Sequence, residues 1–314
     1  MWFIDKVTAF FLIGLVFSIV SFILVYNGLE PTLRFYNPDG REIALYFATL
    51  SNTFISGLIR PSFIYDEPGT FSFFICVLAI LRNLTNRDAR LTWLLMSMGL
   101  ITLSLAHVII FVVYILSSVR FKYSIATIIC VSLLVSFLKE ESLFEPFFWR
   151  FQIDETGQLK GNSRAGIFDN VNRFIDAEIF LLGDHYCLSS KANVNLCDSR
   201  GDMSSSIFTP MYSGGIMMLL FQLYVNFTFI LLAFRRPSFL MISGLMMILL
   251  LSQRPFYDGF GYLQFILLVL FVSFRISMYR NEIKQINGAS CRLKHQGFES
   301  VLQEPEINHK HSHV

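Results

Sequence analysis

Residues 7–26 read VTAFFLIGLVFSIVSFILVY, a run of twenty residues without a charged side chain. A helix rises 1.5 Å per residue, so such a run is about as long as the roughly 30 Å hydrocarbon core of a bilayer. Lys6 precedes the run, but no small-x-small cleavage pattern follows it, which favours a retained span over a cleaved signal peptide. The run therefore predicts a helix that crosses a membrane.

Apolar runs of the same kind recur along the chain. Hydrophobic residues make up 54% of the sequence and charged residues 15%, against about 25% charged residues in a typical soluble domain, and the mean hydropathy is +0.55. Helices formed by these runs lack the polar faces that a soluble helical protein needs. The composition predicts an all-α integral membrane protein with about eight transmembrane helices, at residues 7–26, 70–84, 88–104, 105–119, 123–138, 213–234, 238–252 and 260–278.

The number of spans depends on residues 88–119, which form either one long helix or two short ones. One helix would be roughly 48 Å long, well beyond the bilayer core, whereas two helices of about 24 Å require a tight reversal near Ser104. Basic residues in short loops mark the cytoplasmic side. With two helices, residues 27–69 and 139–212 face outward and the basic residues share the inner side. These are Lys6, Arg82, Arg87, Arg90, Arg120, Lys122, Arg235, Arg236 and the tail from Arg275.

Two amphipathic helices are predicted in the outward-facing segments. In residues 41–60 the apolar side chains recur at three- and four-residue steps and form one stripe, which predicts a helix lying in the outer interface. In residues 139–212, Ser163 is placed to cap a second amphipathic helix. The two stripes consist of Ile43, Phe47, Leu50, Phe54 and Leu58, and of Ile167, Val171, Phe174, Ile175 and Ile179.

The remaining features of these segments concern cysteines and domain organisation. Cys187 and Cys197 are the only cysteines of residues 139–212. In an oxidising periplasm they are expected either to pair as a disulfide or to remain as two free thiols.

The polar residues 279–314 are expected to form a disordered cytoplasmic tail. The chain is thus predicted to hold a polytopic membrane domain, residues 1–278, followed by this tail.

Several classes of function are disfavoured by the sequence. A net charge of +2, without a basic stripe in the soluble segments, argues against a nucleic-acid partner. The chain contains no HExxH, P-loop or GxSxG motif and no DxD pair. We therefore expect neither a metal site nor a cofactor.

Ionisable residues at the predicted helix ends are the candidates for function. Such groups at membrane boundaries often mark a substrate path. Several arginines around one outer cavity would suit a diphosphate, because a guanidinium binds phosphate oxygens at two points and stays charged. The alternative is that the arginines only anchor helix ends and that the glutamate only favours a helix N-terminus. The candidates are Arg60, Glu67, Arg164, Arg173, Arg254 and Asp258.

Five segments share a pattern of spacing with a known family. They are RPSFIYDEPGTFSFFICVLAIL at 60–81, LTWLLMSMGLITLSLAHVIIFVV at 91–113, GNSRAGIFDNVNRFI at 161–175, LLGDHY at 181–186 and YSGGIMMLLFQL at 212–223. The pattern resembles the O-antigen polymerase and ligase family over roughly residues 55–275. In that family an arginine precedes a Glu-Pro-Gly-type start of a span, a later pair of spans carries a Thr-Leu-Ser-like turn, and a large periplasmic loop is followed by a glycine-rich start of the next span.

The resemblance implies a GT-C-like, multi-pass glycosyltransferase of the bacterial inner membrane. Such an enzyme joins oligosaccharide units carried on undecaprenyl diphosphate at the periplasmic face, without a metal or a nucleotide sugar. By the same resemblance, Arg60 and Arg164 hold the diphosphate and stabilise it as a leaving group. Glu67 orients Arg60 or acts as a base. Arg173, Arg254 and Asp258 are expected to bind substrate. The implied partners are the lipid-linked donor and acceptor, membrane lipid, a chain-length regulator and a flippase.

Two departures from the family pattern bear on the activity. Family members usually carry several more spans before the Glu-Pro-Gly segment, so this chain is expected to be short at its N-terminus. The ligase branch tends to carry a histidine before the glycine-rich span, where this chain has Ser204, Ser205 and Ser206, and His185 lies too far upstream. This difference favours polymerase over ligase. A transporter or flippase of lipid-linked glycans is the alternative from another class, although no inverted repeat relates the two halves.

Overall fold

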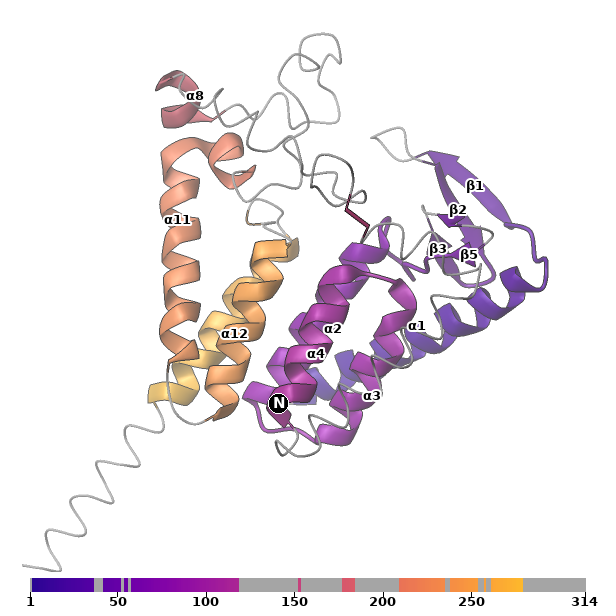
Figure 1. Ribbon diagram of the computed structural model, residues 1–314, viewed down its shortest axis with the longest axis horizontal. Coiled ribbons are helices and arrows are strands. Elements are labelled where there is room, and N and C mark those ends of the chain that lie inside the picture. Colours follow the sequence, from indigo (N-terminus) through magenta and orange to yellow (C-terminus); the bar gives the residue numbers. More distant parts are fainter. Residues whose placement is uncertain are drawn as a thin grey trace, which may run out of the picture. The chain divides into compact units, whose positions relative to one another are not determined.

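The computed structural model describes residues 2–36, 42–51, 54–55, 58–118, 152–153, 177–183, 209–234, 238–253, 257 and 261–278. Within these residues the chain is mainly helical, with short strands between its first two helices (Figure 1). The chain divides into two units, Met1–Val269 and Leu270–Val314. The contacts described below lie within the first unit.

Three described helices are long and apolar enough to cross a membrane. They are α1 (Trp2–Tyr26), the part Ser213–Ala233 of α11 (Thr209–Ala233), and the helix Gly261–Met278. The shorter apolar helices are α2 (Pro68–Leu84), α3 (Ala89–Gly99) with its continuation η1 (Leu100–Thr102), α4 (Leu105–Ser118) and α12 (Ser238–Gln253). The described residues thus give three helices of spanning length where the sequence predicts eight spans, and the predicted span 123–138 lies outside them.

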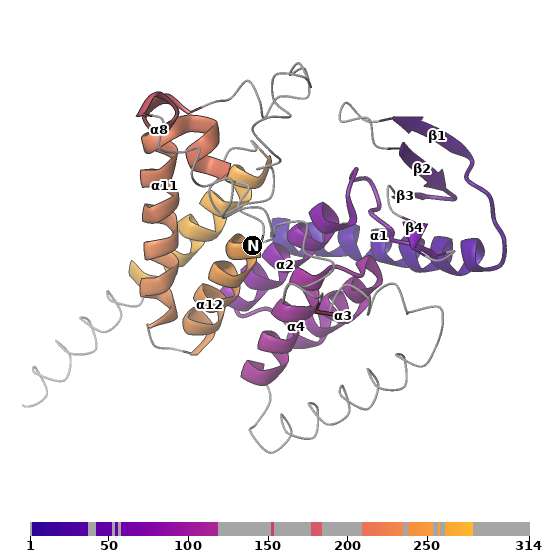
Figure 2. The same ribbon diagram turned by 45° about the horizontal axis from the view of Figure 1, so that its top comes forward.

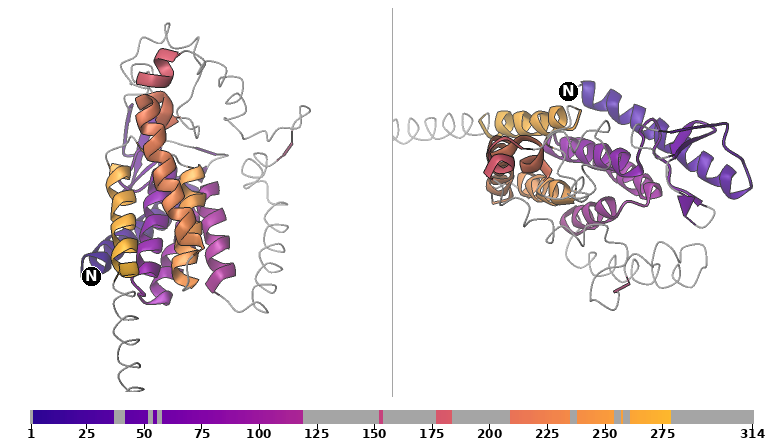
Figure 3. Two further views of the ribbon diagram at one scale, coloured as in Figure 1. Left: turned by 90° about the vertical axis from the view of Figure 1, so that its left-hand side faces the viewer. Right: turned by 90° about the horizontal axis from the view of Figure 1, so that it is seen from above.

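The helix α2 is buried on all sides. It packs against α1, α3, α4 and α12, and α12 in turn packs against α4 and α11. Figure 3 shows the two orange helices, α11 and α12, side by side. An apolar helix that is buried all round belongs to the interior of a helix assembly, which explains the continuous apolar run from Phe73 to Leu81.

Residues 41–60 do not form the predicted amphipathic helix. The structure instead places short antiparallel strands here, so the chain is mainly helical rather than all-α (Figure 2). Three strands form one sheet in the order β1-β2-β3, with Tyr36 opposite Glu42 and Tyr46 opposite Thr49, and two strands form a second sheet. The strands are β1 (Leu33–Tyr36), β2 (Glu42–Tyr46), β3 (Thr49–Ser51), β4 (Phe54–Ile55) and β5 (Leu58–Ile59).

Contacts with α1 explain why strands form here. Ala44 and Tyr46, two residues apart in β2, are buried in one cluster with Val25 of α1 and Ile59 of β5. The hydroxyl of Ser21 on α1 donates a hydrogen bond to the carbonyl oxygen of Tyr46 at 2.9 Å. Side chains at every second residue face the same side of a strand, so the surface of α1 selects the extended conformation over the helical one.

The chain reverses where the sequence predicts a reversal. The helical run α3–η1 ends at Thr102, Leu103 adopts the left-handed conformation (φ 49°), and α4 begins at Leu105. The Nε2 of His107 donates a hydrogen bond of 2.8 Å to the carbonyl oxygen of Met96. In one continuous helix these residues would be about 16 Å apart along the axis. The part of the chain from Ala89 to Ser118 therefore forms two helices joined by a reversal, and not one long helix.

Candidate functional site

Arg60 follows β5, and its side chain contacts the turn between η1 and α4. Its Nε donates to the carbonyl oxygen of Thr102 and its Nη2 to that of Leu103, both at 3.2 Å. The last carbonyl groups of a helix have no partner within the helix, so the half-buried Arg60 caps the end of α3–η1. This contact supports an anchoring role for Arg60 in addition to any contact with substrate.

The segment that joins Arg60 to Glu67 is fixed through Phe63. This residue has a positive φ of 55°, which is rare for a bulky side chain. Its backbone N–H donates to Thr49 Oγ1 at 2.8 Å, and its carbonyl oxygen accepts from the N–H of Leu50 at 2.8 Å. Its ring lies so close to Gly14 of α1 that a Cβ there would be 2.6 Å from a ring carbon. The segment is thereby held against both α1 and the three-stranded sheet.

Glu67 is the residue immediately before α2. Its backbone is extended, Pro68 takes the first helical position, and the carbonyl oxygen of Glu67 accepts from the N–H groups of Thr70 and Phe71. The carboxylate does not cap the helix through a hydrogen bond. A negative charge at this position is still favourable to the helix dipole. Capping therefore does not explain the choice of glutamate at this position.

Hydroxyl and aromatic groups lie near this end of α2. Thr70 Oγ1 and the Tyr262 hydroxyl are 2.7 Å apart and share a hydrogen bond. The ring of Tyr65 stacks on that of Phe74 with a centroid distance of 5.0 Å. Burial, together with the neighbouring Tyr262, raises the pKa of Tyr65 to about 12, so this hydroxyl stays protonated at neutral pH. Hydroxyl groups that form hydrogen bonds therefore lie at the same end of α2 as Glu67.

The other predicted site residues lie outside the described residues. They are Arg164, Arg173, Arg254, Asp258 and the cysteines Cys187 and Cys197. Within the segment SQRPFYDGFG, the structure describes Tyr257, which is fully buried and donates its hydroxyl to Asn226 Oδ1 of α11 at 2.8 Å. Tyr257 is therefore joined to α11.

Two glycine segments of the family-like pattern are in contact. Gly183 follows α8 (Ala177–Leu182), and a Cβ on Gly183 would lie 2.7 Å from the backbone nitrogen of Gly215. Gly214 and Gly215 interrupt the helical conformation of α11, and Gly215 has a φ of 60°. A Cβ on Gly215 would collide with the carbonyl oxygen of Leu181. Only glycine permits this close backbone approach, which joins LLGDHY to YSGG. Of the predicted helix that begins at Ser163, the structure describes only the part from Ala177 onward, which forms α8.

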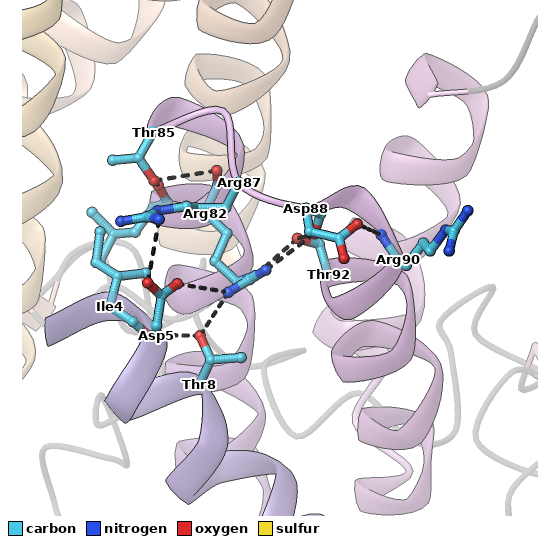
Figure 4. Close-up of polar contacts among 10 residues, drawn as sticks. Ile4, Asp5, Thr8, Arg82, Thr85, Arg87, Asp88, Arg90 and Thr92 are labelled. Atoms are coloured by element: carbon cyan, nitrogen blue, oxygen red, sulfur yellow. Dashed lines mark hydrogen bonds and ion pairs between the residues drawn. The ribbon is translucent and has the colours of Figure 1, made fainter. Parts of the chain in front are cut away.

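Arg82, in the last turn of α2, joins three helices, although its place in the sequence indicates only the membrane topology (Figure 4). Its side chain is 1% exposed. The three guanidinium nitrogens donate to three partners at 3.0–3.1 Å: Nε to Thr92 Oγ1, Nη1 to Thr8 Oγ1 and Nη2 to the carbonyl oxygen of Asp88. Nη1 is also 3.7 Å from Asp5 Oδ1. Arg82 therefore connects α1, α2 and the start of α3.

Arg87 and Asp88 extend this group of charges. Nη1 of Arg87 lies 3.2 Å from Asp5 Oδ2, so one carboxylate serves two guanidinium groups. The Asp88 carboxylate accepts from the backbone N–H of Arg90 at 2.9 Å and caps α3. The signals in the sequence are Asp5 and Thr8, one helical turn apart, and an arginine inside an apolar helix.

These contacts place the two sets of charges at opposite ends of α2. Glu67 precedes the helix and Arg82 lies in its last turn, about 21 Å further along a helix of 17 residues. Arg60 contacts the end of α3–η1, whereas Arg82 contacts its start. The sequence-based topology likewise predicts that residues 27–69 and the turn near Ser104 share one side and that Arg82 and Arg87 lie on the other.

A buried thiol and imidazole lie between these ends. Cys76 Sγ is 3.5 Å from His107 Nδ1, and both side chains are fully buried. Because His107 Nε2 donates to a carbonyl group, Nδ1 is the nitrogen that accepts from the thiol. The residues that the structure describes contain no group of three or more His, Cys, Asp or Glu side chains suited to a metal ion.

Comparison with known proteins adds no relative: no family model, curated protein or solved structure matches this chain.

Proposed function

We propose that this protein is a membrane glycosyltransferase that joins oligosaccharide repeat units, carried on undecaprenyl diphosphate, into a surface polysaccharide at the periplasmic face. The observation that carries the proposal is the arrangement at the start of α2. Arg60 and Glu67 stand at the two ends of one fixed segment, and in the first turn of the helix that follows, the Thr70 hydroxyl shares a hydrogen bond with the Tyr262 hydroxyl. This arrangement lies at the end of an apolar helix, where a lipid-linked substrate presents its head group.

The proposed reaction has defined roles for these groups. A hydroxyl of the acceptor sugar attacks the anomeric carbon of the donor, the bond from that carbon to the diphosphate oxygen breaks, and the lipid diphosphate leaves with the bonding electrons. Glu67 accepts the proton of the attacking hydroxyl. Arg60 and Arg164 offset the charge that develops on the diphosphate. The reaction requires no oxidant, reductant or nucleotide sugar.

Deletion of the gene tests the function as a whole. Surface polysaccharide is separated on a gel, and lipid-linked glycans are extracted from the same cells. Loss of long chains with retention of single repeat units is the expected result. Loss of all surface glycan with lipid-linked units trapped inside would instead identify a flippase. Polymer that accumulates on its lipid carrier without transfer to its final acceptor would identify a ligase.

The variant Glu67→Gln tests the proposed base. Glutamine has the shape of glutamate and the carboxylate is not the helix cap, so α2 should begin as in the parent, and loss of a general base typically lowers a rate by about 10²–10⁴-fold. We expect long polymer to disappear at unchanged protein level. The control is Glu42→Gln, which removes only an exposed ion pair with Arg34. Normal chain lengths in Glu67→Gln would rule out a catalytic carboxylate here.

The variants Arg60→Lys and Arg164→Lys test the diphosphate contacts. An ammonium cannot reproduce the planar two-point contact of a guanidinium, so each variant should lose about ten- to a hundredfold in polymerisation. Arg60→Lys also weakens the cap of α3–η1, and its thermal stability must therefore be measured alongside. If Arg60→Lys loses stability but polymerises normally, Arg60 is only an anchor. Arg34→Lys is the matched control.

A further inference from the structure

The helix α11 has one buried face and one exposed face. It packs against α12, which lies between α11 and α2, and against α8 near its start (Figure 1). On its exposed face, large side chains recur at alternating steps of three and four residues, at Met217, Leu220, Tyr224, Phe227 and Leu231. This average period of 3.5 residues is the one with which two helices pack along each other. The exposed face therefore has the spacing of a helix-packing seam.

Tyr224 is the polar residue of this seam. It is 58% exposed and lies near the middle of the apolar span Ser213–Ala233. At 1.5 Å per residue it is at least about 12 Å from either end of the helical part of the span, which is further than a tyrosine side chain reaches. The Tyr224 carbonyl oxygen accepts from Thr228, but the hydroxyl forms no hydrogen bond with any residue that the structure describes. Asn226, on the same stretch, accepts from the Tyr257 hydroxyl.

Lipid is a poor neighbour for the Tyr224 hydroxyl. A polar group without a partner in the hydrocarbon core costs free energy, because acyl chains neither donate nor accept hydrogen bonds. A suitable neighbour brings a hydrogen-bonding group to the middle of the span and is otherwise apolar, since no charged residue occurs from Ser213 to Ala233.

A second copy of this chain meets both requirements. A two-fold axis along the membrane normal brings the same surface of both copies together and sets Tyr224 of one copy opposite Tyr224 of the other. A phenol hydroxyl both donates and accepts, so the two groups satisfy each other without a third residue. The apolar side chains of the seam likewise meet apolar side chains.

We propose that two copies of this protein associate through the exposed face of α11, with the two Tyr224 hydroxyl groups hydrogen-bonded to each other in the middle of the membrane. The opposite face of α11 keeps its contact with α12. The proposal does not depend on the activity proposed above.

Cysteine cross-linking of the full-length protein in its native membrane tests the contact. The five native cysteines are replaced, and Leu220→Cys and Phe227→Cys are oxidised in separate samples. Both positions belong to the seam, so each should give a disulfide-linked dimer. The control is Ile13→Cys on α1, where the side chain is as exposed as Leu220, and it should give little dimer. Monomer alone at both seam positions, or equal dimer from Ile13→Cys, would overturn the proposal. A cross-link to a different membrane protein in place of the dimer would also overturn it.

The variant Tyr224→Phe tests the hydroxyl contact, because it keeps the ring and removes only the polar group. Hydrogen bonds between spanning helices change association by about three- to thirtyfold. The dissociation constant of the dimer should rise by that factor when fluorescence transfer between differently labelled copies is followed during dilution in detergent. Tyr26→Phe, an exposed tyrosine at the end of α1, is the matched control and should leave the constant unchanged. A parent protein that stays monomeric, or a Tyr224→Phe variant that associates like the parent, would overturn the proposal.

Discussion

The two arginines at the ends of α2 show how differently one residue type acts in this molecule. Arg60 is half-buried and donates to the last carbonyl groups of α3–η1. Arg82 is fully buried and donates through every guanidinium nitrogen. A buried cation is tolerated only when its hydrogen-bonding groups are satisfied, so Arg82 specifies how α1, α2 and α3 meet.

Replacing Arg82 should therefore destabilise the helix assembly. In Arg82→Met the side chain keeps an unbranched apolar stem, but three hydrogen bonds are lost and the hydroxyl oxygens of Thr8 and Thr92 each lose their donor, at a cost of roughly 3 kcal/mol. The midpoint of thermal unfolding in detergent is the measurement. The matched change Arg34→Met removes a solvent-exposed ion pair with Glu42 and should cost at most about 1 kcal/mol. Equal midpoints for the two variants would show that the Arg82 contacts contribute little.

Sequence alone identified Arg60 and Glu67 as candidates, but it did not predict the contacts of either. The capping role of Arg60 depends on carbonyl groups more than forty residues away, which local sequence patterns do not reveal. The role of Arg82 was missed because a basic residue at the end of a span is expected from the positive-inside rule alone. Its burial follows from Thr8 and Thr92, whose positions depend on the packing of three helices.

At the scale of single elements, long apolar helices were predicted well and the segment 41–60 was predicted wrongly. The helix α1 follows from local composition and length, whereas the reversal near Ser104 follows from length and from the distribution of basic residues along the chain. In residues 41–60, apolar residues recur at helical spacing, yet Phe47 is exposed in the turn between β2 and β3. The surface of α1 favours Ala44 and Tyr46 at two-residue spacing, so tertiary contacts override local periodicity here.

The hairpin of α3 and α4 depends on Gly99. A Cβ at this position would lie 2.7 Å from His107 Nε2, the atom that donates to Met96. Gly99→Ala should displace the imidazole and cost roughly 1–3 kcal/mol of stability, despite the better helix propensity of alanine. Thermal unfolding in detergent measures this effect. Gly261→Ala is the control, because nothing lies within 4 Å of a Cβ there, and it should be neutral or slightly stabilising. A stabilised Gly99→Ala would contradict the packing of His107.

At the scale of the whole molecule, α2 separates two groups of charged residues, one around Arg60 and Glu67 and the other around Arg82. The contacts of Arg60 and Arg82 show that α2 and α3 run in opposite directions between the same two ends. α1 joins both ends, because Asp5 is 3.7 Å from Arg82 and Ser21 contacts the strand β2. The proposed catalytic groups and the contacts of Arg82 therefore belong to opposite ends of the same helices.

This arrangement predicts which residues a reagent outside the cell reaches. In a background in which the five native cysteines are replaced, Tyr36→Cys in β1 and Ala89→Cys at the start of α3 each provide one exposed thiol. A membrane-impermeant maleimide, given access to the periplasm, should label Tyr36→Cys in intact cells. Ala89→Cys should be labelled only after the membrane is permeabilised, because the positive-inside rule predicts that the basic residues around it lie on the cytoplasmic side. Labelling of both in intact cells would mean that α2 does not cross the membrane. The reverse pattern would place Glu67 in the cytoplasm and exclude the proposed polymerisation at the periplasmic face.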